Sequence, residues 1–243
     1  MAVKRPLKTL ERALSKAGLG SRTEARSWIG AGRVAVNGKI IQTPDHWVDL
    51  DRDRIEFDGK PLRAAEPVYL LLYKPTGYIT TAHDPDGRPT VYDLIRDVET
   101  WVSPVGRLDL DTSGLLILTN DNQFADQVMS PENKVPKTYL VKTNSHLTDA
   151  DLQRLRDGVE LSDGPTAPAR VTRVRDNASS TFLDVTITEG RNRQVRRMIE
   201  AVGRRVRKLV RTAVGPVQIG DLAIGTWRHL TPRELQALGR LKT

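Results

Sequence analysis

A change of hydrophobic pattern around residues 62–67 divides the chain into two parts. Before it, two short amphipathic segments precede paired strands; after it, many short apolar runs alternate irregularly with helical segments. The segment LRAAEP between them has the small, proline-bearing character of a linker. Because no βαβ glycine fingerprint is present, this order favours an α+β protein whose larger part is built on a mixed, mainly antiparallel sheet. We expect domains at 1–62 and 68–243, with a linker at 63–67.

Two helices are expected near the start of the chain. The first carries Leu7, Leu10 and Leu14 in one apolar stripe, as an amphipathic helix requires. It ends at Gly18. The motif SRTE at 21–24 predicts a capping box, in which a serine and a glutamate satisfy each other's backbone N–H groups and so begin the second helix.

Paired strands and basic side chains complete the first part. Asn37-Gly38 and Asp58-Gly59 each follow a short apolar run, and both dipeptides favour the positive φ angles of a tight hairpin turn. Basic residues lie along the two helices and at the first hairpin, and they form either a solvated face or a surface that contacts a polyanion such as RNA. The candidates are Arg12, Lys16, Arg22, Arg26 and Arg33.

The second part contains the segments expected to form a sheet and its covering helices. Strands are predicted for VYLLLYK, WVSPVGRL, GLLILTN, KTYLVKT, ARVTRVR and TFLDVTI. Capping boxes are predicted at Thr148–Asp151 and Thr231–Glu234. The expected helices lie at about 122–130, 148–157, 191–202 and 232–239.

Composition excludes several classes of function. Cysteine is absent, and the four histidines have no ligand-like spacing, so we expect neither disulfides nor a metal site. No apolar run is long enough to span a membrane, and no secretory signal follows the basic start. The cytoplasm is therefore the expected location. A net charge of +8, from 38 Lys and Arg against 30 Asp and Glu, is compatible with a polyanionic partner.

The segment GRLDLDTSGLLILTND, residues 106–121, holds the candidate carboxylates. If VGRLDLD is extended, Asp109 and Asp111 project to one face of the strand. Asp111 would then support the turn DTSG, and Asp109 would enter a cleft. Two alternatives stay open: both aspartates can be turn residues on an exposed rim, and DTSG also looks like the active-site loop of aspartic proteases, although no second copy is present.

A strongly basic helix is expected within EGRNRQVRRMIEAVGRRVRKLVR, residues 189–211. Its arginines differ in position: Arg193 and Arg197 lie away from the apolar stripe, whereas Arg196 lies on its flank, about 60° from the nearest stripe residue. A flanking arginine can reach a partly buried carboxylate and pair with it bidentately. The alternative is a solvated basic face. The buried stripe is expected to be Val195, Met198, Ile199 and Val202.

An aromatic side chain in the middle of a basic strand gives a third signal. Tyr139 lies within PKTYLVK, where it could stack on an unstacked base. A tyrosine in a strand is also common in ordinary packing.

Taken together and in this order, these segments resemble the RsuA/RluB/RluE/RluF family of ribosomal RNA pseudouridine synthases. The match rests on YKPTGYIT, GRLDLDTSGLLILTND, KTYLVK, EGRNRQVRRM and LVRTAVGPVQIGDL, from about residue 8 to 236. The first part, with SRTEAR and GRVAVNGK, resembles an S4 RNA-binding domain. The resemblance is somewhat greater to the RluB-like members, which act on the large subunit.

The resemblance implies roles for five residues. Asp109 would be the catalytic aspartate. Tyr139 would stack on the target base and take part in proton removal, and Leu209 would pack on that base. Arg196 would pair with Asp109, although Arg193 and Arg197 lie close by in the sequence. Arg107 would help to hold the RNA around the flipped-out uridine. Further RNA contacts are expected from Arg191, Arg193 and Arg197.

The implied activity is isomerisation of uridine to pseudouridine in ribosomal RNA, 23S in the favoured case, with no metal or other cofactor. The expected partner is ribosomal RNA or a pre-ribosomal particle, and the protein is expected to be a monomer that does not associate with membranes. Two alternatives remain: a non-catalytic RNA-binding or ribosome-assembly factor, and a synthase specific for 16S RNA. Because the target atoms lie inside stacked RNA, the base must be extruded into a pocket.

Overall fold

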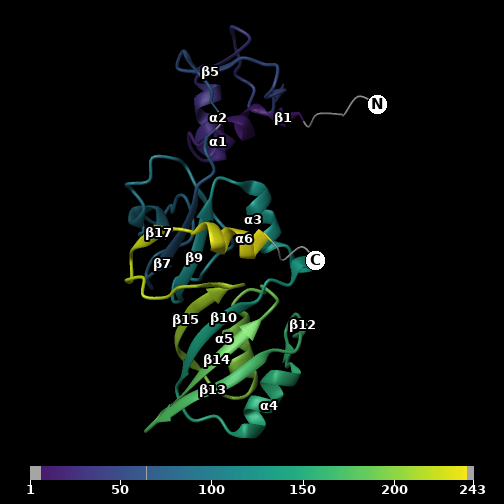
Figure 1. Cartoon of the computed structure of the whole chain (residues 1–243), viewed down its shortest axis with the longest axis vertical. Helices are drawn as coiled ribbons and strands as arrows, with labels where there is room; N and C mark the ends of the chain where they lie inside the picture. The colour runs from purple at the N-terminus through teal and green to yellow at the C-terminus, as the bar shows by residue number, and fades with distance from the viewer. Residues whose placement is uncertain (1–6, 64, 240–243) are drawn as a thin grey trace. The chain divides into compact units, whose positions relative to one another are not determined.

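The computed structural model describes residues 7–63 and 65–239 (Figure 1), which form two compact units. The first comprises the described residues of Met1–Tyr69 together with Arg96–Ser103 and Thr119–Asp121. The second comprises Leu70–Ile95, Pro104–Leu118 and the described residues of Asn122–Thr243. The two units therefore do not correspond to a single division of the chain at the linker, because two short segments from later in the sequence belong to the first unit. The predicted ends at residues 1 and 243, and residue 64 within the predicted linker, lie outside the described residues.

The first unit combines two helices with short strands. Two sheets are present in its described part, one in the order β3-β2-β5-β6 and one pairing β1 with β4. The elements are β1 (Lys8–Thr9), α1 (Leu10–Lys16), α2 (Arg22–Gly30), β2 (Val34–Val36), β3 (Lys39–Ile40), β4 (Trp47–Val48), β5 (Ile55–Phe57) and β6 (Lys60–Pro61).

Local signals in the sequence account for most of this unit. The capping box at Ser21 and Glu24 is confirmed by hydrogen bonds in both directions. Asn37 and Asp58 adopt positive φ angles of 53° and 49°, as the two predicted turns require. Leu7 is a correction: it precedes α1 and is 53% exposed, because the chain pairs as β1 before the helix begins.

The second unit is built around one sheet. The elements beyond the linker are β7 (Tyr69–Lys74), the 3-10 helix η1 (Val91–Leu94), β8 (Ser103–Pro104), β9 (Ser113–Thr119), α3 (Asn122–Met129), the 3-10 helix η2 (Pro131–Asn133), β10 (Lys137–Thr143), α4 (Asp149–Asp157), β11 (Glu160–Leu161), β12 (Gly164–Pro165), β13 (Arg170–Asn177), β14 (Ser180–Ile187), α5 (Gln194–Ala201), β15 (Val206–Val214), β16 (Val217–Gln218), β17 (Trp227–His229) and α6 (Pro232–Gly239).

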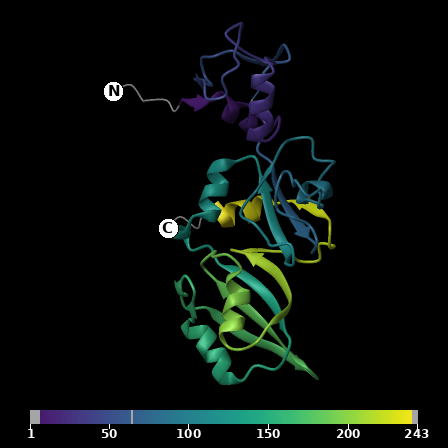
Figure 2. The ribbon, with the colours of Figure 1, turned by 180° about the vertical axis from the view of Figure 1, so that it is seen from behind.

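The strands are ordered β13-β14-β10-β15-β9-β7-β17. β10 pairs antiparallel with both β14 and β15, whereas β9 pairs parallel with β15. The predicted α+β class and the mixed, mainly antiparallel sheet are therefore confirmed. Helices α4 and α5 cover one face of the β13-β14-β10-β15 part, as Figure 2 shows from behind, and their apolar residues share one core with those strands.

The predicted helices and strands are largely found. The capping boxes at 148–151 and 231–234 are present. The stripe of α5 is buried, but this helix begins at Gln194 rather than at 191. WVSPVGRL is wrong as a strand, because only Ser103–Pro104 pair there and the chain turns at Gly106, whose φ is 75°. The structure also contains a strand, β15, that the sequence pattern does not predict.

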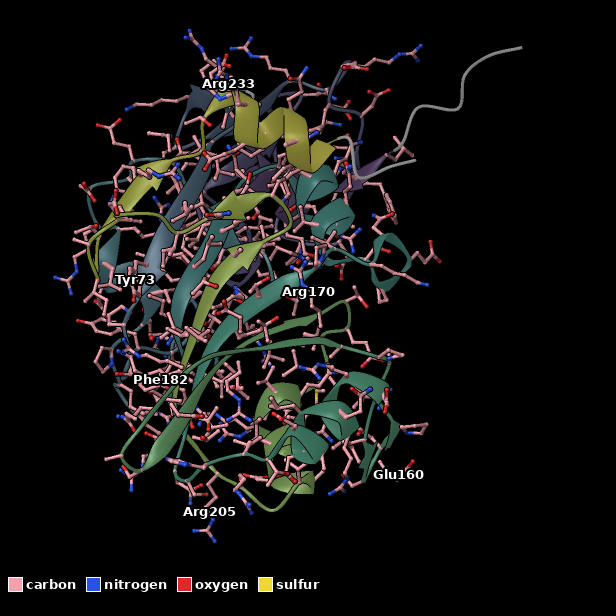
Figure 3. The ribbon with its side chains drawn as sticks, turned by 60° about the horizontal axis from the view of Figure 1, so that its bottom comes forward. Tyr73, Glu160, Arg170, Phe182, Arg205 and Arg233 are labelled. Atoms are coloured by element: carbon pink, nitrogen blue, oxygen red, sulfur yellow. The ribbon has the colours of Figure 1, made fainter. Side chains whose placement is uncertain are left out.

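Exposed arginines are spread over the surface of the second unit. Figure 3 labels Arg170 on β13, Arg205 just before β15 and Arg233 on α6, all of which are exposed. Among the described residues, none of the helices combines the length and apolar character that crossing a membrane requires.

Candidate active site

A tight turn presents Asp109. The backbone N–H of Thr112 donates to the carbonyl of Asp109 at 3.1 Å, which closes the turn. VGRLDLD is therefore not one extended strand, the condition under which Asp109 and Asp111 would share a face, and Ser113 and Gly114 already belong to β9 rather than to the turn. The turn leaves the Asp109 side chain 36% exposed, so its carboxylate remains accessible.

Lys74, the last residue of β7, holds this turn in place. Its side chain is fully buried, and its Nζ donates to the carbonyls of Pro75 (3.0 Å), Asp109 (3.0 Å) and Thr112 (2.8 Å). Burial lowers the pKa of Lys74 to about 8, although the charge of Asp109 acts in the opposite direction. Because the ammonium group bonds to both ends of the turn, it fixes the backbone from which the Asp109 carboxylate projects.

A second loop supports the same turn. The hydroxyl of Thr80 donates to the carbonyl of Leu108 at 2.8 Å. The N–H of Gly77 donates to the carbonyl of Leu110 at 2.8 Å. The segment YKPTGYIT, which begins with the last two residues of β7, is thus bonded to the residues on either side of Asp109.

Two arginines of EGRNRQVRRM reach the turn, and both pair with Asp111. Arg193 donates to both carboxylate oxygens of Asp111, at 2.9 and 3.0 Å, and its Nη1 lies 3.8 Å from Oδ2 of Asp109. Arg196 donates to the backbone carbonyl of Asp111 at 2.8 Å, with its carboxylate at 3.3 Å. The hydrogen bonds from Arg193 lower the pKa of Asp111.

The expected pair between Arg196 and Asp109 is therefore not the one observed. Arg196, 8% exposed, does reach the turn from the flank of the buried stripe, but its carboxylate partner is Asp111. The arginine nearest to Asp109 is Arg193. The physical reason is the turn itself. A strand would have pointed both carboxylates to one face, whereas at the bend Arg193 lies near both of them and Arg196 reaches only Asp111.

The position of Arg193 depends on an unusual backbone conformation. Its φ of 46° lies in the left-handed region, which costs a non-glycine residue about 1 kcal/mol or more. This conformation precedes the first residue of α5, Gln194, and explains why the helix begins later than its pattern predicts. In this conformation the Arg193 side chain forms the ion pair with Asp111.

The facing wall of the site comes from two neighbouring strands. Tyr139 of β10 pairs with Arg211 of β15, and Val141 pairs with Leu209. Leu209 and Arg211 alternate with Val210 and so project to the same face of the sheet. Arg211 is buried, and its Nε donates to a backbone carbonyl of β9 at 2.7 Å.

Gly114 allows β9 and β15 to approach closely. A Cβ atom at this position would lie 2.3 Å from the carbonyl oxygen of Arg211, well inside contact distance. The φ of Gly114 is 120°, which also favours glycine. The last residue of DTSG is thus required for the packing that brings Arg211 beside Asp109.

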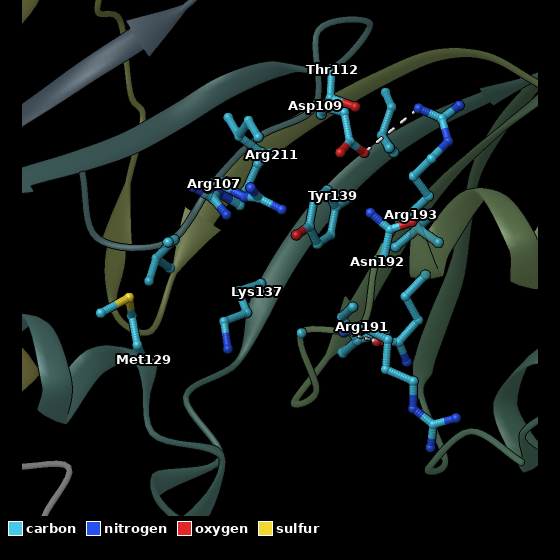
Figure 4. Close-up of a pocket in the computed structure, with 18 of the residues that line it drawn as sticks. Arg107, Asp109, Thr112, Met129, Lys137, Tyr139, Arg191, Asn192, Arg193 and Arg211 are labelled. Atoms are coloured by element: carbon cyan, nitrogen blue, oxygen red, sulfur yellow. Dashed lines mark hydrogen bonds and ion pairs between the residues drawn. The ribbon is translucent and has the colours of Figure 1, made fainter. Parts of the chain in front are cut away.

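These side chains enclose a cavity of about 370 Å³. Figure 4 shows Asp109 and Tyr139 on its walls, with Arg107 and Arg211 grouped on one side and Arg193 on the other. Four of the five residues given roles by the resemblance line it, the exception being Arg196. The lining also includes Val105, Gly106, Leu108, Thr112, Val128, Met129, Lys137, Ile187, Gly190, Arg191, Asn192, Gln194, Val195, Leu209 and Val214.

The basic residues predicted to bind RNA in the first unit fall into two groups. Arg22 and Arg26 both pair with Glu11, whose side chain is 1% exposed. Arg33 pairs with Asp58 and lies over an aromatic ring. By contrast Arg12 and Lys16 are exposed and have no carboxylate partner within the described part of the chain.

Arg191 and Arg197 are committed to structural contacts. Arg197 donates to both carboxylate oxygens of Asp163, at 2.7 and 3.0 Å, and does not line the cavity. Arg191 lines the cavity but donates to the carbonyls of Gly164 and Pro165, at 2.9 and 2.6 Å. Both arginines hold the β11–β12 hairpin against the start of α5.

Pattern analysis gives no role to three residues of the site: Lys74, Lys137 and Arg211. Lys74 and Lys137 do lie within the quoted segments YKPTGYIT and KTYLVK, which is the signal that could have found them. Arg211 lies on β15, which the alternation of apolar residues does not predict. No group of three or more metal-ligating side chains occurs in residues 7–63 and 65–239.

Comparison with known proteins identifies the class. Residues 68–201 match the family model described as RNA pseudouridylate synthase, and residues 9–52 match the S4 domain. The chain belongs to the RNA pseudouridylate synthase family and carries an S4 domain before its catalytic part. The aspartic-protease interpretation of DTSG is therefore wrong.

Particular relatives are similar over nearly the whole chain. The ribosomal large subunit pseudouridine synthase B of Bacillus subtilis is 40% identical over 237 residues, which cover 97% of each chain. An uncharacterized RNA pseudouridine synthase of Aquifex aeolicus is 40% identical over 94% of this chain and 92% of its own. A solved structure described as a pseudouridylate synthase superposes with a TM-score of 0.68 at 30% identity, covering 95% of this chain and 99% of the other.

Proposed function

We propose that this protein converts a uridine of large-subunit ribosomal RNA to pseudouridine, with Asp109 as the catalytic residue. The observation that carries the proposal is the cavity in which Asp109, Tyr139 and Leu209 meet. In the sequence these residues are 30 and 70 positions apart, and only the sheet and the turn bring them together. A protein that merely bound RNA would not need an accessible carboxylate beside a stacking tyrosine.

The reaction rearranges one nucleotide without adding or removing atoms from the chain. The bond between N1 and C1′ breaks, the uracil turns within the cavity, and C5 bonds to C1′; C5 then loses a proton and N1 gains one. Asp109 can contribute as a nucleophile toward C1′ or as a base that starts an elimination at the sugar. Either role requires an ionised carboxylate, and cationic groups of Arg193, Lys74 and Arg211 lie around the turn that carries it.

The other lining residues suit an extruded base. Tyr139 offers a ring for stacking, and Leu209 adds an apolar surface from the next strand, as a flipped pyrimidine requires. Arg107 is exposed at the edge of the cavity, where it would contact the RNA around the extruded uridine. Arg12 and Lys16 of the S4 domain would bind phosphates outside the catalytic unit.

The choice of target follows the relatives whose names specify one. Several are named ribosomal large subunit pseudouridine synthase B, including the Escherichia coli protein at 39% identity over 91% of this chain. Large-subunit RNA, 23S, is therefore the proposed substrate, alone or in a pre-ribosomal particle. We further propose that the protein acts as a monomer in the cytoplasm and without a cofactor.

Asp109→Asn tests the catalytic assignment, because it keeps the shape of the side chain and removes its charge. We expect no pseudouridine formation on a large-subunit RNA transcript, with RNA affinity within about twofold of the wild type. Asp221→Asn, an equivalent change at an exposed position of the same unit, is the matched control and should keep full activity. Mapping of pseudouridines in ribosomal RNA from cells with and without the protein identifies the uridine.

Each alternative predicts a different outcome. A ribosome-assembly factor would bind the transcript but leave the pseudouridine map unchanged when the protein is removed. A 16S-specific synthase would lose a modification in small-subunit RNA instead. An active Asp109→Asn variant would refute the assignment of the catalytic residue while leaving the family's reaction in place.

A further inference from the structure

A second cavity, of about 550 Å³, adjoins the one that contains Asp109. The two share four lining residues: Met129, Lys137, Gly190 and Arg191. The second cavity extends from this junction along the start of β10, the segment that precedes it, and the residues after β14. Its remaining lining residues are Pro131, Lys134, Ala167, Thr188 and Glu189.

Lys137 stands at the junction without an acidic partner. No carboxylate of the described residues lies within ion-pair distance of its Nζ. Burial and the nearby charge of Arg211 lower the pKa of Lys137. Figure 4 shows its side chain directed into the space between Met129 and Arg191, away from Asp109. A half-buried cation next to a second cation is unfavourable in the free protein, and an anionic ligand at this point would compensate for it.

The other charges at the junction are already used within the protein. Arg191 donates to two backbone carbonyls of the β12 region and to Glu189 at 3.2 Å. Glu189 also accepts from the N–H of Ala167 at 3.2 Å and from the side chain of Gln194. The carboxylate of Glu189 is therefore already paired, and Lys137 is the cation at the junction that is left to bind a ligand.

The walls of the second cavity suit a nucleotide. Met129 is 42% exposed, and together with Pro131 it gives one side an apolar surface on which a base can lie. Lys134, exposed and in the left-handed conformation with a φ of 46°, adds a second positive charge. A cavity with an apolar side and unpaired cations fits a base joined to a phosphate.

We propose that the second cavity binds the nucleotide next to the target uridine, and that Lys137 binds the phosphate joining the two nucleotides. This inference rests on the function proposed above. Lys137 and Tyr139 lie two residues apart on β10, so they share a face with their Cα atoms about 7 Å apart. A uridine stacked on Tyr139 therefore leaves its backbone within reach of Lys137.

Lys137→Met tests the phosphate contact by removing the charge and keeping an unbranched apolar chain. Lys142→Met, at the other end of β10 and outside both cavities, is the matched control. With the modified uridine known from the pseudouridine map, a short RNA around it is made in three forms: unaltered, or with a neutral methylphosphonate in place of either phosphate adjoining the uridine.

We expect the Lys137 variant to bind the unaltered RNA about tenfold more weakly than the wild type. One of the two methylphosphonates should weaken binding by the wild type to a similar extent. The same methylphosphonate should not weaken binding by the Lys137 variant any further. The control, Lys142→Met, should bind each of the three RNAs as tightly as the wild type does. Equal binding of the unaltered RNA by wild type and Lys137→Met would overturn the inference. The inference would also fail if each of the two methylphosphonates weakened binding by the variant as much as it weakens binding by the wild type.

Stability gives an independent readout. Because Lys137 has no partner in the free protein, Lys137→Met should unfold at the same or a higher temperature than the wild type. A clear decrease would mean that Lys137 is structural and would also overturn the inference. If the map shows no pseudouridine that depends on the protein, the proposed function fails first, so the two failures are distinguishable.

Discussion

Replacing Lys74 by methionine should loosen the turn that carries Asp109. The wild-type ammonium donates to three carbonyls, two of them at the ends of this turn. Methionine has a similar length and fills the buried site, but it has no donor. The three carbonyls would then lose a partner that is fully buried in the wild type.

The size of the effect follows from two opposing contributions. Hydrogen bonds from a charged donor stabilise by about 1.5–3 kcal/mol each, and three are lost. Against this, the lowering of the pKa of Lys74 to about 8, in which burial outweighs the charges of Asp109 and Asp111, indicates that keeping the ammonium charged at this site has a net cost of about 3 kcal/mol. Methionine avoids that cost. The expected net loss in the free energy of unfolding is about 3 kcal/mol, which urea denaturation at pH 7 would measure.

The same change should slow catalysis more than it weakens RNA binding. A displacement of about 1 Å at a reacting group can cost about 10²-fold in rate, whereas Lys74 does not line the cavity. Single-turnover assays on large-subunit RNA should therefore show a large fall in the rate constant and little change in affinity. Lys208→Met, on an exposed part of β15, is the control and should change neither quantity.

The pH dependence of stability provides a further check on Lys74. Because its pKa is lower in the folded protein than its ordinary value of 10.5, the unfolded chain binds more protons between about pH 8 and 10.5. This group therefore makes the folded state more stable as the pH rises through that window. The stability difference between wild type and Lys74→Met should grow over the same range. A Lys74→Met protein with wild-type stability and wild-type turnover would refute the reasoning.

Two further changes test the packing of the units. Gly114→Ala should destabilise the protein by about 2 kcal/mol or more, because the added Cβ meets the backbone of β15 and the φ of this residue disfavours alanine. The control Gly30→Ala, which has open space around it, should not destabilise the protein. Equal unfolding midpoints for the two variants would contradict the close approach of β9 and β15. Glu11→Gln should cost about 1–3 kcal/mol, because the buried carboxylate pairs with two arginines. The exposed Glu132→Gln is its control in the same thermal unfolding assay, and a Glu11→Gln protein as stable as this control would show that the pairs contribute nothing.

Local chemistry explains why much of the fold could be predicted. A capping box, an Asn-Gly turn or an apolar stripe depends on residues within a few positions of one another, so Ser21 with Glu24, Asn37 with Gly38, and the buried face of α5 follow from the sequence. The strand β15 does not. Its lysines and arginines interrupt the alternation on which strand prediction rests, and its buried Arg211 is stabilised by a carbonyl of β9 that no local pattern contains.

The sequence by itself determined the α+β class, the two-part organisation and the resemblance from which Asp109, Tyr139 and Leu209 were selected. Only the tertiary structure decided which charges meet. The turn at Asp109 pairs Arg193 and Arg196 with Asp111, the end of β7 buries Lys74 beneath that turn, and the parallel approach of β9 to β15 requires Gly114. Each of these contacts joins residues more than 30 positions apart, where partner choice depends on backbone geometry and burial. The segment GRLDLDTSG names the carboxylates, but the structure assigns each of them its neighbours.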